Sequence, residues 1–505
     1  MKWISPIIAA LTAMPLAAQE PLSAIDWLSK SVRDKPVVIA PDDAIRPGNA
    51  GGEITVTPLA EIRKDTVGLL PASVTGLPRN FWAGSSSDTI AALIAQQKID
   101  SLPEILTLLY TILLAEVDAP ASGAGSADLL LARTDKLLDL GALDQAQALL
   151  ERAGPNEAEI FRRWFDVSLL TGHEDHACTA MRAAPGFAPT LQARVFCLAR
   201  GGDWNAAALT LATGETLGFI SRADADLMAW FLDPELFAGE PDLPPPNPLT
   251  PLDFTMREAI ALPRPAGALP LAFANADLRT SAAWRSQMEA AERLVRSQAA
   301  PARQLIEFYT ERQAAASGGI WNRVKAIQAF DVALLSGESA AIGAALPAAW
   351  EAMREVALEV PISQYYGDRL ADIPLTGPAR DVAFKVALLS DNFEDTVRDF
   401  DTTTPRQAFL QGLAAGNVSA RNATATLNTA IADAFEKPMP DGALRDLLNE
   451  GKLGETVLRA MLLLEGEAFA DPGDVRAALS AFRAVGLEKE ARRIAIQLLL
   501  LERRG

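Results

Sequence analysis

Few side chains in this sequence have reactive or metal-binding chemistry, and these lie close together: His173, His176, Cys178 and Cys197. They are all the histidines and cysteines of the chain. The run GHEDHAC, residues 172–178, offers imidazole, thiolate and carboxylate groups, which are metal ligands. Its histidines are three residues apart, however, whereas a zincin helix needs a spacing of four. Glu174 and Asp175 suit the first turn of a helix, where the dipole favours negative charge. We therefore predict no metal and no cofactor.

Other catalytic patterns are also missing from the sequence. There is no G-x-S-x-G nucleophile elbow, and both histidines belong to one motif, which disfavours a hydrolase triad. The glycine-rich residues 47–52 lack the lysine of a phosphate-binding loop, and the acidic residues 391–401 lack the glycine of a calcium loop. We predict that the chain is not an enzyme. One alternative stays open, because two of its 64 acidic residues converging in a cleft would allow cleavage of peptidoglycan or another polysaccharide.

The elements that carry these residues show an internal repeat between residues 126 and 214. Three glycines at spacings of 31 and 30 are each followed five residues later by an alanine: Gly141 and Ala146, Gly172 and Ala177, Gly202 and Ala207. Large apolar residues recur nine residues after and eleven before each glycine. A fixed period of this length indicates a helical hairpin, with glycine in the turn and alanine where the two helices approach closely.

The repeat places the two cysteines on neighbouring helices. Cys178 falls in the second helix of the middle unit, and Cys197 falls in the first helix of the next. The turn at residues 185–189 lies midway between them. Residues equidistant from the turn of an antiparallel hairpin lie side by side, within reach of a disulfide. We predict a Cys178–Cys197 disulfide; two reduced, buried cysteines are the alternative.

The best-matching unit, LGALDQAQALLERAGP at residues 140–155, resembles the TPR family. It has Gly141 near the turn, Ala146 five residues later, and Pro155 as the helix breaker that closes the unit. The period is shorter than the usual 34 of that family, and its aromatic positions are degenerate. The resemblance covers residues 126–214 and implies a TPR-like α-solenoid of stacked antiparallel helical hairpins. The sequence also resembles secreted helical-repeat proteins of Gram-negative bacteria, in GLPRNFW (residues 76–82), the cysteine hairpin and the C-terminal GLEKEARRIAIQLLLLE.

Composition and the positions of proline and glycine residues divide the chain into five parts. Residues 1–18 have the charged, apolar and small-residue order of a signal peptide cleaved near Ala18. Residues 19–85 lack helical periodicity and predict an extended arm over the helical body. Residues 86–235 predict the repeat domain, the proline-rich residues 236–252 a linker, and residues 253–505 a second helical-repeat domain. Apolar residues make up 49% of the chain, and alternating strand patterns are scarce, so we expect an all-α protein.

The net charge of −18 limits the kinds of partner that we expect the protein to bind. A nucleic-acid binder needs a positive footprint, so we predict no nucleic acid, and no segment is long and apolar enough to predict an integral membrane span. A basic protein remains compatible with this charge. Our leading hypothesis is an exported periplasmic scaffold that binds a protein partner in the cell envelope. The polysaccharide-cleaving enzyme and a ligand-binding or motility-accessory periplasmic protein are the alternatives.

Overall fold

The computed structural model describes residues 63–120, 127–265, 267–418, 425–465 and 471–501. Over these ranges the protein is all-α, as predicted, and its extended pairing is limited to one parallel bridge between Leu70 and Ala115. The predicted signal peptide and residues 19–62 of the predicted arm lie outside the described residues. Residues 63–85 pack on the helical body, since the backbone N–H groups of Leu69 and Leu70 donate to the Leu114 carbonyl at the end of α4 (Pro103–Leu114).

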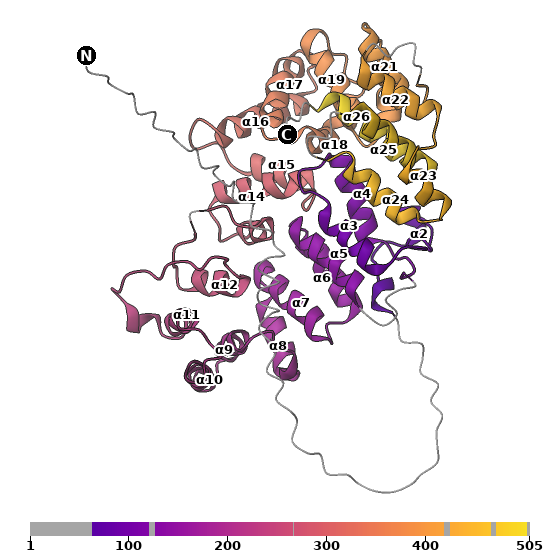
Figure 1. Ribbon diagram of the computed structural model, residues 1–505. Coiled ribbons are helices and arrows are strands. Elements are labelled where there is room, and N and C mark those ends of the chain that lie inside the picture. Colours follow the sequence, from indigo (N-terminus) through magenta and orange to yellow (C-terminus); the bar gives the residue numbers. More distant parts are fainter. Residues whose placement is uncertain (1–62, 121–126, 266, 419–424, 466–470, 502–505) are drawn as a thin grey trace, which may run out of the picture.

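The helices of the first half include the predicted repeat (Figure 1). They are η1 (Lys64–Thr66), α2 (Ala72–Thr75), α3 (Ser87–Gln96), α4, α5 (Asp128–Asp139), α6 (Leu143–Ala153), α7 (Ala158–Thr171), α8 (Glu174–Ala183), η2 (Pro185–Phe187), α9 (Leu191–Arg200), α10 (Trp204–Thr216), α11 (Arg222–Leu232) and η3 (Pro234–Phe237). Short polar residues set several of their starts. Ser86 caps α3, where the sequence predicts a helix to begin, and Thr190 and Asp203 cap α9 and α10 by accepting from backbone N–H groups.

The second half continues as helices joined by short turns. They are α12 (Pro251–Ala259), η4 (Leu271–Phe273), α13 (Ala274–Asp277), α14 (Trp284–Arg296), α15 (Ala302–Glu311), α16 (Ile320–Ser336), α17 (Ser339–Arg354), α18 (Glu359–Leu370), α19 (Gly377–Leu389), α20 (Phe393–Thr396), α21 (Pro405–Ala414), α22 (Thr426–Glu436), α23 (Ala443–Asn449), α24 (Leu453–Leu462), α25 (Pro472–Ala484) and α26 (Glu488–Leu500). Proline at the first position of α12, α21 and α25 suits a helix start, where its missing N–H is not needed.

The proline-rich segment before α12 is non-helical and is held by one arginine. Arg257 of α12 is buried and donates to the carbonyl of Leu243 at 2.8 Å and to that of Pro263 at 3.0 Å. Its guanidinium therefore joins the chain on both sides of the helix. A capping box between Thr250 and Asp253 fixes the start of α12 directly after the segment.

The last helices return to pack on the first ones, so the two ends of the described chain lie together (Figure 1). We call this contact, of α24 with α3 and of α26 with α4, the N–C seam. Phe81 and Trp82, from the GLPRNFW motif, are buried here. A Cβ atom on Gly454 would lie 2.4 Å from the Trp82 ring, and the Gly454 N–H donates to the Phe81 carbonyl at 2.9 Å. Only glycine allows α24 to approach so closely.

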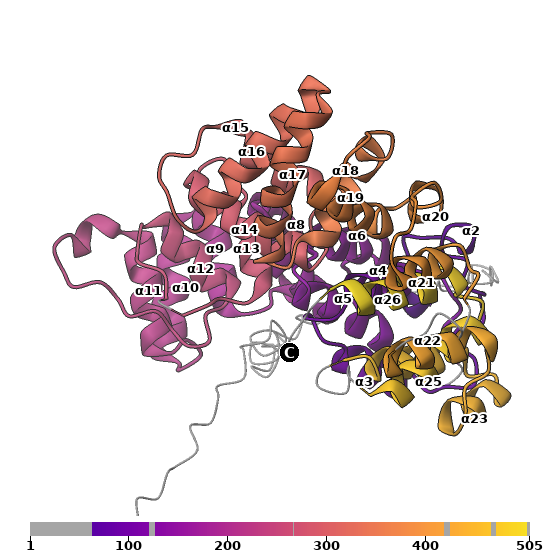
Figure 2. The ribbon, with the colours of Figure 1, turned by 90° about the horizontal axis from the view of Figure 1, so that it is seen from above.

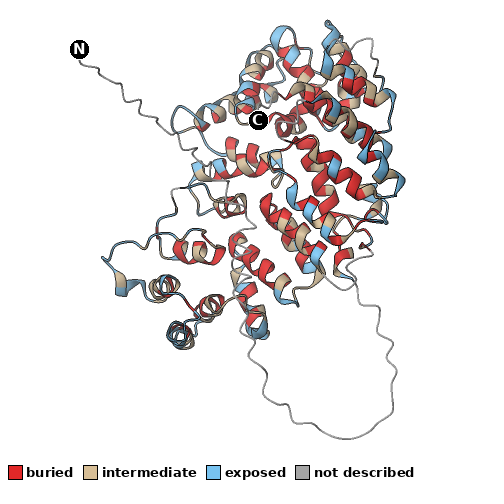
Figure 3. Ribbon diagram, in the orientation of Figure 1, coloured by how far each residue is buried: buried red, intermediate tan, exposed pale blue. Residues whose placement is uncertain are grey.

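Polar side chains complete the N–C seam. The Gln97 amide donates to the Leu458 carbonyl at 3.1 Å, and the Ser101 hydroxyl donates to Glu465 at 2.9 Å. The predicted helical regions 86–235 and 253–505 are thus joined by an extensive interface, while the boundary between them stays a prediction. Buried residues run through α4, α5 and α7 in the centre of the molecule, whereas α9 to α11 form a lobe at one end (Figures 2 and 3).

Glu104 of α4 is a buried carboxylate in the N–C seam. Its backbone N–H donates to the Gln497 side chain at 2.9 Å, and its Oε2 lies 3.5 Å from a guanidinium nitrogen of Arg493 on α26. Burial raises the pKa of Glu104 to about 7, although Arg493 acts to lower it. Glu490 and Asp391 add negative charge nearby, which also raises it. The N–C seam therefore contains a carboxyl group that titrates near neutral pH.

We expect the protein to lose stability as the pH rises from about 4.5 to about 7. The folded-state pKa of Glu104 lies above its ordinary value of 4.5, so its contribution is fully present below pH 4.5 and lost as the pH rises through 7. Burial likewise raises the pKa values of Asp166 and Asp253 to about 6. Urea denaturation at pH 5 and pH 8 measures the effect. Glu104→Gln should reduce the difference in unfolding free energy between the two pH values by about 2.5 kcal/mol; an unchanged difference would contradict this assignment.

Candidate functional site

The predicted repeat residues occupy equivalent positions in three consecutive helix pairs, α5/α6, α7/α8 and α9/α10. The three glycines follow the first helix of each pair and have positive φ angles: Gly141 (77°), Gly172 (82°) and Gly202 (82°). The three alanines lie in the second helices and are 0% exposed: Ala146, Ala177 and Ala207. The left-handed backbone at the turns favours glycine, and each alanine lies within a helix–helix contact.

The two ends of this array differ in what covers them. A Cβ on Gly141 would lie 2.8 Å from Leu294 and 2.9 Å from Leu271, and Asn275 donates to the Gly141 carbonyl at 2.9 Å. The first turn is thus covered by η4, α13 and α14 of the second half. A Cβ on Gly202 would meet no described atom within 4 Å. The third pair therefore presents an open turn.

The cysteines link the second pair to the third. Cys178 on α8 and Cys197 on α9 are both buried, their Sγ atoms lie 1.94 Å apart, and their Cα atoms are separated by 5.0 Å. This is disulfide distance, as predicted. The bond would tie α9, and with it α10, to the body of the molecule.

Cys197→Ser is expected to lower the free energy of unfolding of the oxidised protein by about 3 kcal/mol. The bond closes a loop with a sequence separation of 19, and a loop of this size restricts the unfolded chain by about that amount. Thermal melting with and without dithiothreitol provides the measurement. The substitution should have little effect on the reduced protein; an equal loss in both states would show that the cysteines are merely packed.

The histidines do not form a metal site with their neighbours. No group of three or more histidine, cysteine, aspartate or glutamate side chains in the described ranges is arranged to hold a metal ion. His173 precedes α8, and its Nδ1 lies 3.1 Å from the Thr171 hydroxyl. The His176 ring packs edge-on against Trp164, with the ring centroids 5.2 Å apart. Glu174 and Asp175 begin α8, as the sequence predicts for a helix first turn.

The most unusual exposed feature is α10, which carries apolar side chains on both sides. Ala207, Leu211 and Gly214 are buried towards α9 and α11. On the other side Trp204 is 52% exposed and Leu209 70% exposed. Ala208 and Ala212 are also exposed and fall between them around the helix axis, at about 100° per residue. The exposed polar residues Asn205, Glu215 and Thr216 fall in the same arc. We call the face formed by Trp204, Ala208, Leu209 and Ala212 the α10 surface.

Further exposed apolar side chains follow along the chain. Leu217 is 62% exposed and Phe219 is 55% exposed in the turn after α10, and Leu236 is exposed in η3. Five of the nine large hydrophobic side chains exposed in the described ranges thus lie between residues 204 and 236. Single exposed apolar residues are ordinary, whereas apolar side chains that adjoin on one surface, as Trp204 and Leu209 do with the alanines between them, indicate an interaction site. This face was not predicted from the sequence. The signal that the sequence offers for it is the lack of amphipathicity in α10, whose apolar residues surround the helix.

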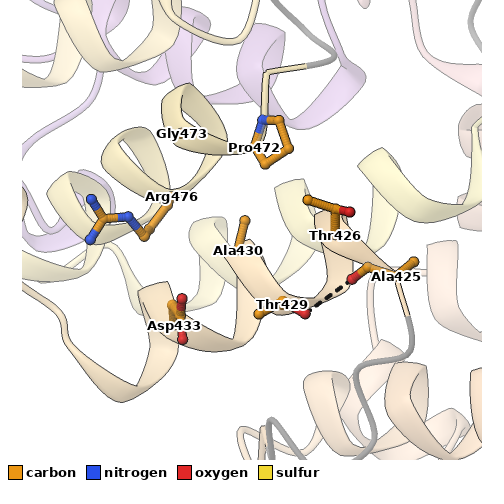
Figure 4. Close-up of a pocket in the computed structure, with 8 residues that line it drawn as sticks. All are labelled: Ala425, Thr426, Thr429, Ala430, Asp433, Pro472, Gly473 and Arg476. Atoms are coloured by element: carbon orange, nitrogen blue, oxygen red, sulfur yellow. Dashed lines mark hydrogen bonds between the residues drawn. The ribbon is translucent and has the colours of Figure 1, made fainter.

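A hollow of about 480 Å³ lies between α22 and α25 (Figure 4). It is open to solvent, and two of its polar side chains, Thr429 and Arg476, have partners within the protein. The Thr429 hydroxyl donates to the Ala425 carbonyl at 3.1 Å, and Arg476 pairs with Asp441 at 3.2 Å. Asp433 is the one carboxylate in its lining. This hollow therefore does not supply the carboxylate pair that polysaccharide cleavage requires.

In comparisons with known proteins, the chain matches no family model, no curated protein and no solved structure. Among the described helices, none combines the length and the apolar character needed to cross a membrane. The α10 surface is accordingly the candidate functional site on the strength of its geometry.

Proposed function

We propose that this chain is an exported, TPR-like helical-repeat scaffold that binds a protein partner in the cell envelope, with the periplasm as its compartment. The observation that carries the proposal is the α10 surface. A helix with apolar residues all round is normally buried, yet one side of α10 faces solvent. Covering Trp204 and Leu209 with a partner would remove this unfavourable exposure.

The helix pairs support the repeat interpretation. Glycine turns with positive φ and fully buried alanines recur in three consecutive units, at the columns expected for stacked hairpins. Stacked hairpins commonly present protein-binding surfaces. The third unit is the one with an open turn, and the same unit carries the α10 surface. A partner seated there would cover the side of α10 that faces away from α9 and α11.

Two features favour the exported compartment. The order of residues 1–18 is that of a signal peptide. The cysteine pair at disulfide distance suits an oxidising compartment, in which disulfides form and persist.

Crosslinking in intact cells followed by affinity purification tests the proposal. We expect a specific envelope protein to be recovered with the wild type and lost with Trp204→Ser/Leu209→Ser. The matched control is Val332→Ser/Leu335→Ser, which removes two apolar side chains of α16 that are at least as exposed. Retention of the partner by the α10 variant, or recovery of no protein at all, would contradict the proposal.

A further inference from the structure

We infer that the partner segment that occupies the α10 surface is a basic amphipathic helix. This inference rests on the proposed function and specifies the chemistry of the partner. It combines the shape of the α10 surface with the charge of the lobe that carries it. Neither a second copy of this chain nor an anionic membrane has the required charge.

The segment that carries the exposed apolar residues is strongly acidic. Residues 203–242 contain eight acidic residues and one basic residue, Arg222. Arg222 is itself neutralised, because its guanidinium pairs with Asp226 at 3.1 Å and with Glu215 at 3.4 Å. Four of the acidic residues are exposed at the end of the segment: Asp233, Glu235, Glu240 and Asp242. They add to the negative electrostatic potential of the lobe.

The neighbouring helices do not reverse this charge. From α8 onwards, residues 174–242 contain ten acidic and four basic residues. Arg200, at the end of α9, pairs with Asp175 at 2.7 Å and with Glu174 at 3.2 Å. A partner therefore approaches a negative lobe, and positive charge on the partner would both speed the encounter and favour the complex.

The shape of the α10 surface favours a helix as the occupant. Trp204, Ala208 and Ala212 follow one another at intervals of four residues, and Leu209 stands beside them. The two alanines allow another helix to approach closely, while the large side chains on either side provide apolar contact area. A partner helix with one apolar face and lysine or arginine on the other would satisfy both requirements at once.

Two other occupants are disfavoured by charge. A second copy docked through the same face would bring two negative lobes together. The chain's own residues 19–62 contain seven acidic and four basic residues, so their net charge is −3; three of the basic residues lie in residues 30–35, directly before Pro36, which leaves no long basic helix. An anionic lipid surface would be repelled by the same acidic residues.

The test uses a synthetic 18-residue peptide with leucine on one helical face and lysine on the other, titrated into the full exported chain by calorimetry. We expect it to bind, with an affinity that falls as salt is added. Two matched peptides separate the contributions: one replaces every lysine with glutamate, and the other replaces every leucine with serine. Both are expected to bind at least tenfold more weakly.

Protein variants locate the binding. Trp204→Ser/Leu209→Ser should raise the dissociation constant at least tenfold, and so should the charge reversal Glu235→Lys/Glu240→Lys/Asp242→Lys. Val332→Ser/Leu335→Ser should leave it unchanged. Because the altered side chains are exposed, melting curves should coincide with that of the wild type; if the double variant melts lower, Leu209→Ser alone replaces it.

Several results would overturn the inference. The first is a glutamate peptide that binds as tightly as the lysine peptide. The second is an α10 variant that binds the lysine peptide as tightly as the wild type, or an α16 control that loses as much affinity as the α10 variant. The third is a wild-type dimer in sedimentation that the α10 substitutions convert to a monomer. The last result would identify a second copy as the occupant. An envelope protein captured through α10 by an acidic or neutral segment would sink this inference while leaving the proposed function intact.

Discussion

Replacing Arg133 with alanine is expected to lower the free energy of unfolding by about 4 kcal/mol. Arg133 lies on α5 and is 1% exposed. Its guanidinium donates to the backbone carbonyls of Leu113 at 2.7 Å, Val67 at 2.8 Å and Ala115 at 3.1 Å. It thereby joins the segment before α2 to the end of α4. Alanine would leave these buried carbonyls without donors and would open a cavity beside them.

The charge of Arg133 is retained despite its burial. Burial lowers its pKa to about 10, and the charge of Asp65 opposes that change. The group therefore stays protonated at neutral pH, and its hydrogen bonds are of the stronger, charge-assisted kind. Urea denaturation followed by circular dichroism measures the loss.

A matched control separates burial from charge. Arg222→Ala also removes an arginine with ion pairs, but its side chain is 81% exposed, so the expected loss is below about 1 kcal/mol. Arg133→Lys should fall between the two, because one ammonium cannot satisfy the same fork of acceptors. Equal effects of Arg133→Ala and Arg222→Ala would contradict the role assigned to the buried guanidinium.

Ala146→Trp is expected to destabilise the protein by about 3 kcal/mol or more. Ala146 is 0% exposed on α6, which packs against both α5 and α7. An indole at this position overfills the contact and forces the helices apart. Ala177→Trp, one unit later, should act in the same way because its side chain is equally buried. Thermal melting and helical circular dichroism provide the measurement.

The control for this substitution is Ala208→Trp. Ala208 lies on α10 but is exposed, so the same indole has room there and melting should be nearly unchanged. Unaltered melting of Ala146→Trp would mean that the repeat register is wrong. A large loss in Ala208→Trp would mean instead that the α10 surface is covered within the chain itself.

Local features of the fold were predictable because they leave a periodic trace in the sequence. The glycine turns and the buried alanines recur at a fixed spacing, and the apolar residues of the helices recur with the helical period. Both patterns can be seen in the sequence alone. The proximity of Cys178 and Cys197 follows from the same register, since a hairpin turn determines which residues lie opposite each other.

The N–C seam could not be predicted in this way. Gln97 and Leu458 are 361 positions apart, and no local pattern relates them. Trp82 belongs to a motif noted in the sequence, but its packing on Gly454 depends on the return of the chain after hundreds of residues. Burial of Arg133 was hidden for a different reason. Arginine is usually a surface residue, and its carbonyl acceptors come from segments whose meeting is set by tertiary packing.

The α10 surface could not be predicted from the repeat, because the repeat identifies only the buried columns. Ala207 and Leu211 fit these columns, so the repeat predicts that α10 packs within the helical body. Trp204 and Leu209 lie off the columns, and their exposure becomes evident once the contacts of α10 with α9 and α11 are known. An interaction site of this kind depends on which side of a helix is left uncovered by the rest of the fold. Sequence periodicity does not contain this information.

The proposed function requires that the α10 surface bind a protein partner in the cell envelope. Its most direct test introduces the photocrosslinker p-benzoylphenylalanine at Leu209 of the exported protein in intact cells, with the same substitution at Leu335 as control. We expect one specific crosslinked protein from position 209 and none from position 335. No crosslink at 209, or the same products from both positions, would contradict it.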